Sequence, residues 1–184
     1  MREADAGDRA VAGCLDRYGR LDVLVNNVGS GRIFTGFAAE PDESWQEFWE
    51  LNFMSAVRTT RSALPHLTQV RGVVINVSSI NGHLPYPGLY SYNTSKAAMD
   101  SLTVGLAREY APHGVRVVGV APGPVSTPLW LGPAGAAAQI SALDGGTPQE
   151  VIAEMEEEIP LGRFATPEEV ASVIAFLASP GPVR

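Results

Sequence analysis

The sequence predicts an α/β protein built on a doubly wound parallel sheet in three layers, α/β/α. Short continuous apolar runs alternate with longer amphipathic stretches, and each apolar run ends in polar or glycine-rich residues. Buried parallel strands produce the first pattern, and the helices that connect them produce the second. Because 45% of the 184 residues are hydrophobic, the chain can build one core, and we treat residues 1–184 as a single, partial domain.

The first elements follow from hydrophobic periodicity. A helix is expected over residues 3–18, where apolar residues recur at helical spacing from Val11 and Gly19 ends the pattern. The run LDVLVNNVG then predicts a buried strand over 21–26 that opens into a loop. A long amphipathic pattern follows and predicts a helix over 42–67.

The middle of the chain repeats this order. GVVINVSS predicts a second buried strand over 72–79, and a second long helix is expected over 92–110. VRVVGVAPGPV predicts a third strand over 115–125, which its prolines end. The order helix, strand, helix, strand, helix, strand indicates parallel pairing of the three strands.

The last third of the chain contains a flap and two helices. The Gly/Ala/Pro-rich stretch 129–147 is expected to be irregular, and with the residues up to 160 it forms the predicted flap 129–160. Two helices close the chain, each preceded by Thr-Pro-x-Glu, at Thr147 and Thr166. Threonine before the helix, proline at its first position and glutamate two residues later predict two capping boxes.

Composition excludes several classes of function. The net charge of −7, the isoelectric point near 4.9 and the absence of clustered basic residues argue against nucleic-acid binding. No apolar run is long enough to cross a bilayer, so no membrane partner is expected. The single cysteine, Cys14, excludes an internal disulfide, and the three histidines lack metal-ligand spacing. We therefore expect a soluble, cytoplasmic protein that acts on a small molecule and binds no metal.

The three predicted strands end in NNVG, VSSING and APGPVST. Ligands of open parallel sheets bind beyond the carboxyl ends of the strands, so these segments should share one crevice. Tyr92 and Lys96, the only lysine in the chain, lie four residues apart on one face of the predicted helix. An ammonium beside a phenol favours the phenolate, which would give Tyr92 a lower pKa and make it a general base.

Two serines end the second strand. Ser79 lies thirteen residues before Tyr92, and its hydroxyl could hold a substrate carbonyl beside the phenol. For Ser78 a structural role is favoured, in which the hydroxyl satisfies a backbone group at the turn. Asn26 is interpreted in the same way, as a tie between strands.

These motifs together resemble the short-chain dehydrogenase/reductase family. The segments that carry the resemblance are, in order, NNVG, the Asn52 of LNFMSA, GVVINVSSING, YNTSK and APGPVST. The likeness runs from about residue 10 to 179 and implies a Rossmann-like fold. It also implies NAD or NADP as cofactor, without a choice between them, and hydride transfer between nicotinamide and a carbonyl or alcohol carbon.

The resemblance assigns roles by position. Tyr92 corresponds to the general acid and base, and Ser79 to the hydroxyl that orients the reacting oxygen. Lys96 would hold the nicotinamide ribose and shift the Tyr92 equilibrium, and Asn52 would anchor a water in a proton relay. Cofactor contacts are implied for Asn27, Val28, Gly29, Tyr92, Lys96, Pro122, Gly123, Val125 and Thr127.

The resemblance also predicts surroundings for this site. Helices 42–67 and 92–110 would pack against their copies in a homo-oligomer. The flap 129–160 would close over the substrate, with Leu129, Trp130 and Leu131 lining its pocket.

The family pattern is incomplete in this sequence. A family member should open with a strand, a glycine-rich turn and a helix that hold the pyrophosphate, and it should end in a further strand. The sequence therefore predicts a domain truncated at both ends. GSGRIFTG, over 29–36, is glycine-rich but does not open a helix in the required frame. Two hypotheses remain open: an NAD(P)-dependent oxidoreductase, or a catalytically inactive fragment or interaction module that binds no dinucleotide by itself.

Overall fold

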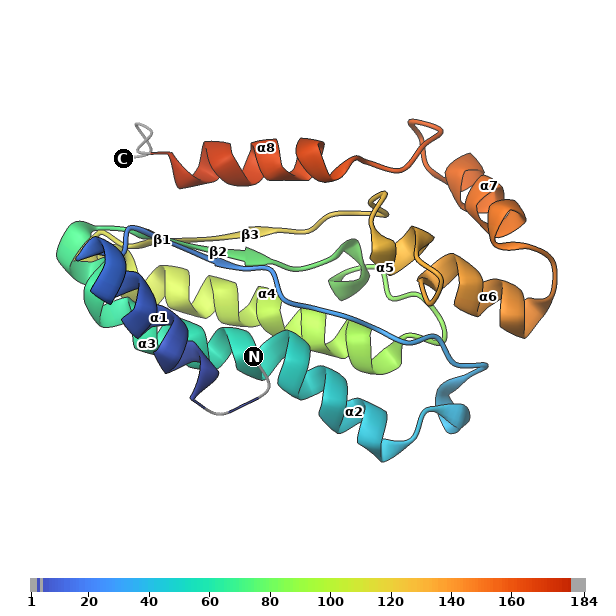
Figure 1. Cartoon of the computed structure of the whole chain (residues 1–184), viewed down its shortest axis with the longest axis horizontal. Coiled ribbons are helices and arrows are strands. Elements are labelled where there is room, and N and C mark those ends of the chain that lie inside the picture. Colours follow the sequence, from blue (N-terminus) through green and yellow to red (C-terminus); the bar gives the residue numbers. More distant parts are fainter. Residues whose placement is uncertain (1–2, 4, 180–184) are drawn as a thin grey trace.

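The computed structural model describes residue 3 and residues 5–179, which fold as a three-stranded parallel sheet with helices on both faces (Figure 1). The strands are β1 (Val23–Asn26), β2 (Val73–Val77) and β3 (Arg116–Val120), in the spatial order β1-β2-β3. The helices are α1 (Ala6–Tyr18), α2 (Asp42–Trp49), α3 (Ser55–Val70), α4 (Tyr90–Tyr110), α5 (Pro128–Leu131), α6 (Ala136–Asp144), α7 (Pro148–Glu158) and α8 (Pro167–Ala178). The predicted doubly wound α/β class is confirmed.

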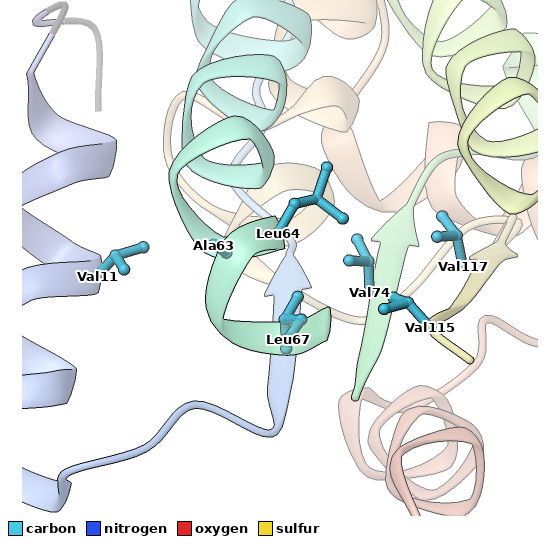
Figure 2. Packing of buried hydrophobic residues seen from close by; sticks show 7 residues of the cluster. All are labelled: Val11, Ala63, Leu64, Leu67, Val74, Val115 and Val117. Atoms are coloured by element: carbon cyan, nitrogen blue, oxygen red, sulfur yellow. The ribbon is translucent and has the colours of Figure 1, made fainter. Parts of the chain in front are cut away.

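The sheet lies between two layers of helices. Figure 1 shows α1, α3 and α4 along one face of the sheet and α8 along the other. The main hydrophobic core fills the space between the sheet and the first layer, and Figure 2 shows its buried members: Val11, Ala63, Leu64, Leu67, Val74, Val115 and Val117. Burial of these side chains fixes the strands against α1 and α3, so the strand ends keep one position. None of the helices in the described residues is long and apolar enough to cross a membrane.

The two long helices form where the periodicity placed them, with one interruption. The stretch 42–67 consists of α2, a π-helical turn over Glu50–Met54, and α3, which runs on to Val70. A π turn widens the helix by one residue and is common at functional sites. The hydrophobic pattern of residues 42–67 does not show where the π turn lies, so the sequence predicted one continuous helix.

The expectation of an irregular flap is wrong for most of the segment 129–160. Helices α5, α6 and α7 occupy it, separated by glycines. Alanine has the highest helix propensity, so the alanine-rich run that begins α6 forms a helix. Gly145 follows it with φ of +90°, a conformation that ends the helix. Both predicted capping boxes, at Thr147 and Thr166, are present.

A network of buried amides and hydroxyls links β1 and β2 to each other and to α3 and α4. Asn26 Nδ2 donates to Asn76 Oδ1 at 2.8 Å and to Thr60 Oγ1 at 2.9 Å. Asn76 Nδ2 donates in turn to Thr103 Oγ1 at 2.8 Å. Asn76 is fully buried, so each of these groups depends on its protein partners. The prediction that Asn26 ties strands together is confirmed, and the network holds β1, β2, α3 and α4 in register.

Replacing Asn76 by alanine should destabilise the fold. Its removal leaves the buried Asn26 amide and the Thr103 hydroxyl each short of a partner, so the free energy of unfolding should fall by roughly 2 kcal/mol or more. Urea denaturation followed by circular dichroism measures this loss. The exposed Gln46→Ala variant is the control and should stay within about 0.5 kcal/mol of the wild type. A loss for Asn76→Ala no larger than that of the control would contradict the structural role of the network.

Candidate active site

A cavity of about 480 Å³ lies beyond the carboxyl ends of the three strands. Its walls are the loops that follow the strands, the first turns of α4, part of the flap and one side of α8. The predicted site residues that line it are Asn27, Gly29, Ser79, Tyr92, Lys96, Pro122, Gly123, Val125 and Thr127. Val28 is exposed and Asn52 lies buried behind the wall, so these two do not line it. Small-molecule sites commonly measure about 300–1,000 Å³, so the cavity has a suitable size.

Tyr92 and Ser79 meet in this cavity. Ser79 follows β2 in an extended conformation, and its Oγ accepts a hydrogen bond from the backbone N–H of Asn81 at 3.2 Å. The Ser79 and Tyr92 side chains line the same cavity. Burial raises the pKa of Tyr92 above its usual value, and the interaction of the phenol with the Ser79 side chain opposes this rise. The phenol is therefore protonated at neutral pH and can donate a proton.

Lys96 lies one helical turn after Tyr92 with its side chain almost completely buried, at 3% exposure. Its Nζ donates to the backbone carbonyl of Val77 at 2.9 Å, which ties α4 to the end of β2. Burial lowers the pKa of Lys96 to about 8, and the charge of Asp100 opposes this change. At neutral pH the site therefore holds an ammonium that loses its proton unusually easily.

The structure corrects one detail of the sequence-based interpretation. We expected the Lys96 ammonium to lower the pKa of Tyr92, but the pKa of Tyr92 is raised by burial. The Lys96 ammonium lies 5.6 Å from the centre of the Tyr92 ring and donates to the carbonyl of Val77, while the phenol interacts with the Ser79 side chain. The two side chains therefore share a helix face and a cavity without direct pairing of their polar atoms.

Asn52 lies within the π-helical turn and connects two walls of the site. Its Oδ1 accepts from the backbone N–H of Ser30 at 2.9 Å, and its Nδ2 donates to the carbonyl of Ser30 at 2.9 Å. Nδ2 also donates to Ser95 Oγ on α4 at 3.1 Å. A Cβ at Gly29 would lie 3.2 Å from Lys96 Nζ and 3.4 Å from Asn52 Oδ1. Glycine at this position lets the loop after β1 approach both side chains closely.

Glu40 contributes to the site although sequence reasoning missed it. The carboxylate is buried, and its two oxygens lie 3.3 and 3.4 Å from the backbone N–H of Ser91, the second residue of α4. α4 has no side-chain cap of its own at Leu89, so Glu40 supplies the missing acceptor and negative charge at the helix N-terminus. In the sequence Glu40 is only a loop residue ahead of α2, with no motif to mark it.

Other lining residues were predicted only in part. Leu129 and Trp130 line the cavity as expected, whereas Leu131 is 48% exposed and does not. Several apolar or amide side chains were not anticipated: Ile33, Leu89, Gln139, Val170 and Ile174. They come from loops and helices whose approach to the strand ends depends on tertiary packing, which a periodic pattern does not encode.

The comparison with known proteins places this geometry in a family. The family model described as short chain dehydrogenase matches residues 1–132. The chain belongs to the short-chain dehydrogenase family. Within the described residues no cluster of three or more His, Cys, Asp or Glu side chains that could hold a metal ion occurs.

Relatives in this family agree with the fold. The 3-oxoacyl-(acyl-carrier-protein) reductase of Thermotoga maritima is 34% identical over 180 residues, which are 97% of this chain and 67% of that protein. L-fucose dehydrogenase of Mus musculus is 35% identical over 173 residues, which are 92% of this chain and 59% of the relative. The solved structure of L-sorbose reductase from Gluconobacter frateurii, complexed with NADPH and L-sorbose, superposes with a TM-score of 0.86 at 32% identity, over 97% of this chain and 67% of that one.

The chain spans from 52% to 68% of the lengths of the curated relatives it matches. Family membership supports NAD or NADP as the cofactor and does not choose between them. The residues present fit the nicotinamide half, because Lys96 lines the cavity and has donors beyond the one used on Val77. The stretch 29–36 is irregular and leads into a three-residue 3₁₀ turn, so it offers no helix N-terminus to a pyrophosphate.

Replacing Lys96 by methionine should stabilise the fold in a pH-dependent way. The folded pKa of about 8 lies below the ordinary value of 10.5, so the unfolded chain binds more protons between these two pH values. At pH 7 the buried ammonium costs the wild type on the order of 3 kcal/mol, a cost that disappears as the pH rises towards 10.5. The free energy of unfolding of Lys96→Met should therefore exceed that of the wild type at pH 7 and approach it at pH 10. A difference that does not change between pH 7 and pH 10, measured by urea denaturation, would contradict this account.

Proposed function

We propose that this chain carries the catalytic centre of an NAD(P)-dependent oxidoreductase that interconverts a carbonyl compound and an alcohol. The observation that supports this most directly is that Ser79, Tyr92 and the buried Lys96 line one cavity, in which the Tyr92 phenol interacts with the Ser79 side chain. A proton donor, an orienting hydroxyl and a positive charge in one enclosed space are the groups that carbonyl reduction requires.

In the direction of reduction, Tyr92 acts as the general acid. The substrate oxygen accepts a hydrogen bond from Ser79, which places it beside the Tyr92 hydroxyl, and the phenol proton passes to that oxygen. A nicotinamide dinucleotide held by Lys96 and the loops after β1 and β3 would supply the hydride to the carbonyl carbon, or accept it in oxidation. The raised pKa of Tyr92 keeps the phenol protonated, which favours proton donation at neutral pH.

Proton donation leaves a phenolate in a largely buried site, and this charge must be stabilised. Lys96 provides a positive charge in the same cavity, with its ammonium 5.6 Å from the ring centre. Asn52 acts as a positioning residue, because its amide holds Ser30 against Ser95 and so fixes the loop that faces both catalytic side chains. A role of Asn52 in anchoring a relay water is part of this proposal.

A second candidate function is a catalytically inactive module that associates with another chain. The observation that favours it is the exposed apolar surface of α8, on which Phe176 is 75% exposed and Val173 49%. Such a surface is typical of a face that another polypeptide covers. Under this alternative the catalytic side chains would be retained without binding a dinucleotide.

We also propose a homo-oligomer that forms through the helical stretches 42–67 and 92–110. A groove between α3 and α4 is lined by apolar side chains, among them Val57, Leu64, Leu102 and Leu106, and by the basic side chain of Arg61. Light scattering after size exclusion should give a mass that is a multiple of the 19.5 kDa chain, and a monomer at high concentration would exclude this assembly. A cytoplasmic location stays a prediction from composition.

The Tyr92→Phe variant should lose turnover and keep the fold. Removal of the hydroxyl takes away the proton donor, so kcat should fall by about 10²- to 10⁴-fold with a panel of ketones and either NADH or NADPH. Tyr90→Phe is the matched control, since Tyr90 lies on the same helix outside the cavity lining and should tolerate the change. Unchanged kcat in Tyr92→Phe would refute this catalytic assignment, provided that thermal unfolding shows both variants to be folded.

A further inference from the structure

The buried ammonium of Lys96 has no ionic partner in direct contact. Lys96 is 3% exposed, and its Nζ donates to the uncharged backbone carbonyl of Val77. Among the residues that the structure describes, Lys96 takes part in no ion pair. A buried charge without a counter-ion is costly, so its stabilisation should come from a charge that lies further away.

Asp100 supplies such a charge from the same helix. It lies four residues after Lys96 on α4, a spacing that places two side chains next to each other, about 6 Å apart along the helix axis. The Asp100 side chain is 21% exposed. Its Oδ2 is buried and accepts no hydrogen bond from any residue in the described part of the chain. A buried carboxylate oxygen without a donor favours a positive charge nearby.

The 3₁₀ turn that follows Ser79 closes over this carboxylate. The turn spans Ile80–Gly82, and a Cβ at Gly82 would overlap Asp100 Oδ2 and lie 3.2 Å from the carbonyl carbon of Lys96. Only glycine leaves room for the carboxylate between the turn and the helix. The turn therefore shields Asp100 from water, and the weaker screening strengthens its electrostatic attraction for Lys96.

The titratable side chains near Lys96 come from two segments. Tyr92 and Asp100 belong to α4, and the centre of the Tyr92 ring is 5.6 Å from the Lys96 ammonium. His83 follows the 3₁₀ turn, and its Nε2 lies 3.3 Å from Asp100 Oδ2, although the His83 side chain is 63% exposed. β2 meets Lys96 through a backbone carbonyl and the loop after β1 through Gly29, so these contacts bring no further titratable group.

We propose that Asp100 is a positioning residue of the active site, whose carboxylate stabilises the Lys96 ammonium from outside the cavity. Asp100 does not line the cavity, so it acts through Lys96 and not on the substrate. This inference rests on the proposed function, because that function needs a charged Lys96 beside Tyr92. Burial lowers the pKa of Lys96 to about 8 and the charge of Asp100 opposes this change, so without Asp100 the proton should be lost at a still lower pH.

The charge of Lys96 can be measured directly, because it is the only lysine in the chain. In the whole protein, isotope-labelled at the lysine Cε, a single NMR signal reports the titration of this ammonium. The midpoint gives the pKa of Lys96, which should be about 8 in the wild type. Asp100→Asn keeps the shape of the side chain and removes its charge, so the midpoint should move down by about half a pH unit or more.

Two further variants complete the experiment. Glu109→Gln is the matched control, because it removes the same charge from an exposed position near the far end of α4. About 20 Å of helix separates it from Lys96, well beyond the screening length of about 8 Å, so its midpoint should equal that of the wild type. His83→Arg changes an exposed side chain and should fold. It places a permanent cation beside Asp100, so the midpoint should again move down.

A midpoint that stays at the wild-type value in both Asp100→Asn and His83→Arg would overturn the inference, as would an equal shift in Glu109→Gln. An unfolded chain cannot imitate the expected result, because its lysine would titrate near the ordinary pKa of 10.5, above the wild-type value. Neither turnover nor cofactor binding is measured, so a failure here is distinct from a Tyr92→Phe variant that keeps its activity.

Discussion

The buried ammonium of Lys96 is the constraint on which the rest of the site depends. A charged side chain at 3% exposure requires a fixed partner, and the carbonyl of Val77 at 2.9 Å provides it. This bond joins α4 to the end of β2, and Ser78 reinforces the junction by donating from its hydroxyl to the backbone carbonyl of Lys96 at 3.2 Å. The helix that carries Tyr92 is therefore held against β2, which Ser79 follows, and both side chains line one cavity.

The remaining contacts of the site bring other segments to this junction. Asn52 accepts a hydrogen bond from Ser30 in the loop after β1, and Glu40 accepts one from Ser91 at the N-terminus of α4. Gln139 of α6 accepts a hydrogen bond from Ile33 in the loop after β1. Each contact joins residues that lie far apart in the chain. The cavity walls combine apolar side chains with polar ones such as Asn27, Asn81 and Thr127, as is usual for small-molecule sites.

The sequence predicted the parts of this structure that depend on local pattern. Hydrophobic runs identified β1, β2 and β3, and the polar residues at their ends identified Ser79 and the loops around the cavity. The spacing of Tyr92 and Lys96 needed only the geometry of a helix. Asn52 was identified as a candidate site residue by the family resemblance and not by hydrophobic periodicity.

The features that the sequence did not predict depend on tertiary structure. The π turn at Glu50–Met54 has no signature in the hydrophobic pattern. The contacts of Glu40 with Ser91 and of Gln139 with Ile33 join partners separated by tens of residues, so no local pattern marks them. The raised pKa of Tyr92 depends on burial, which spacing alone does not reveal. In the flap, the glycines and prolines led to a prediction of irregular structure, but the alanines between them begin the helix α6.

The central claim is that the cavity around Lys96 holds a nicotinamide dinucleotide, and thermal unfolding tests it most directly. A ligand that binds only the folded state raises its stability, by about 2.7 kcal/mol at a concentration one hundred times its dissociation constant. The account predicts that NADH or NADPH raises the unfolding midpoint of the wild type, and that Lys96→Met loses most of this increase. A cooperative transition that neither cofactor moves would contradict the claim and favour the inactive module.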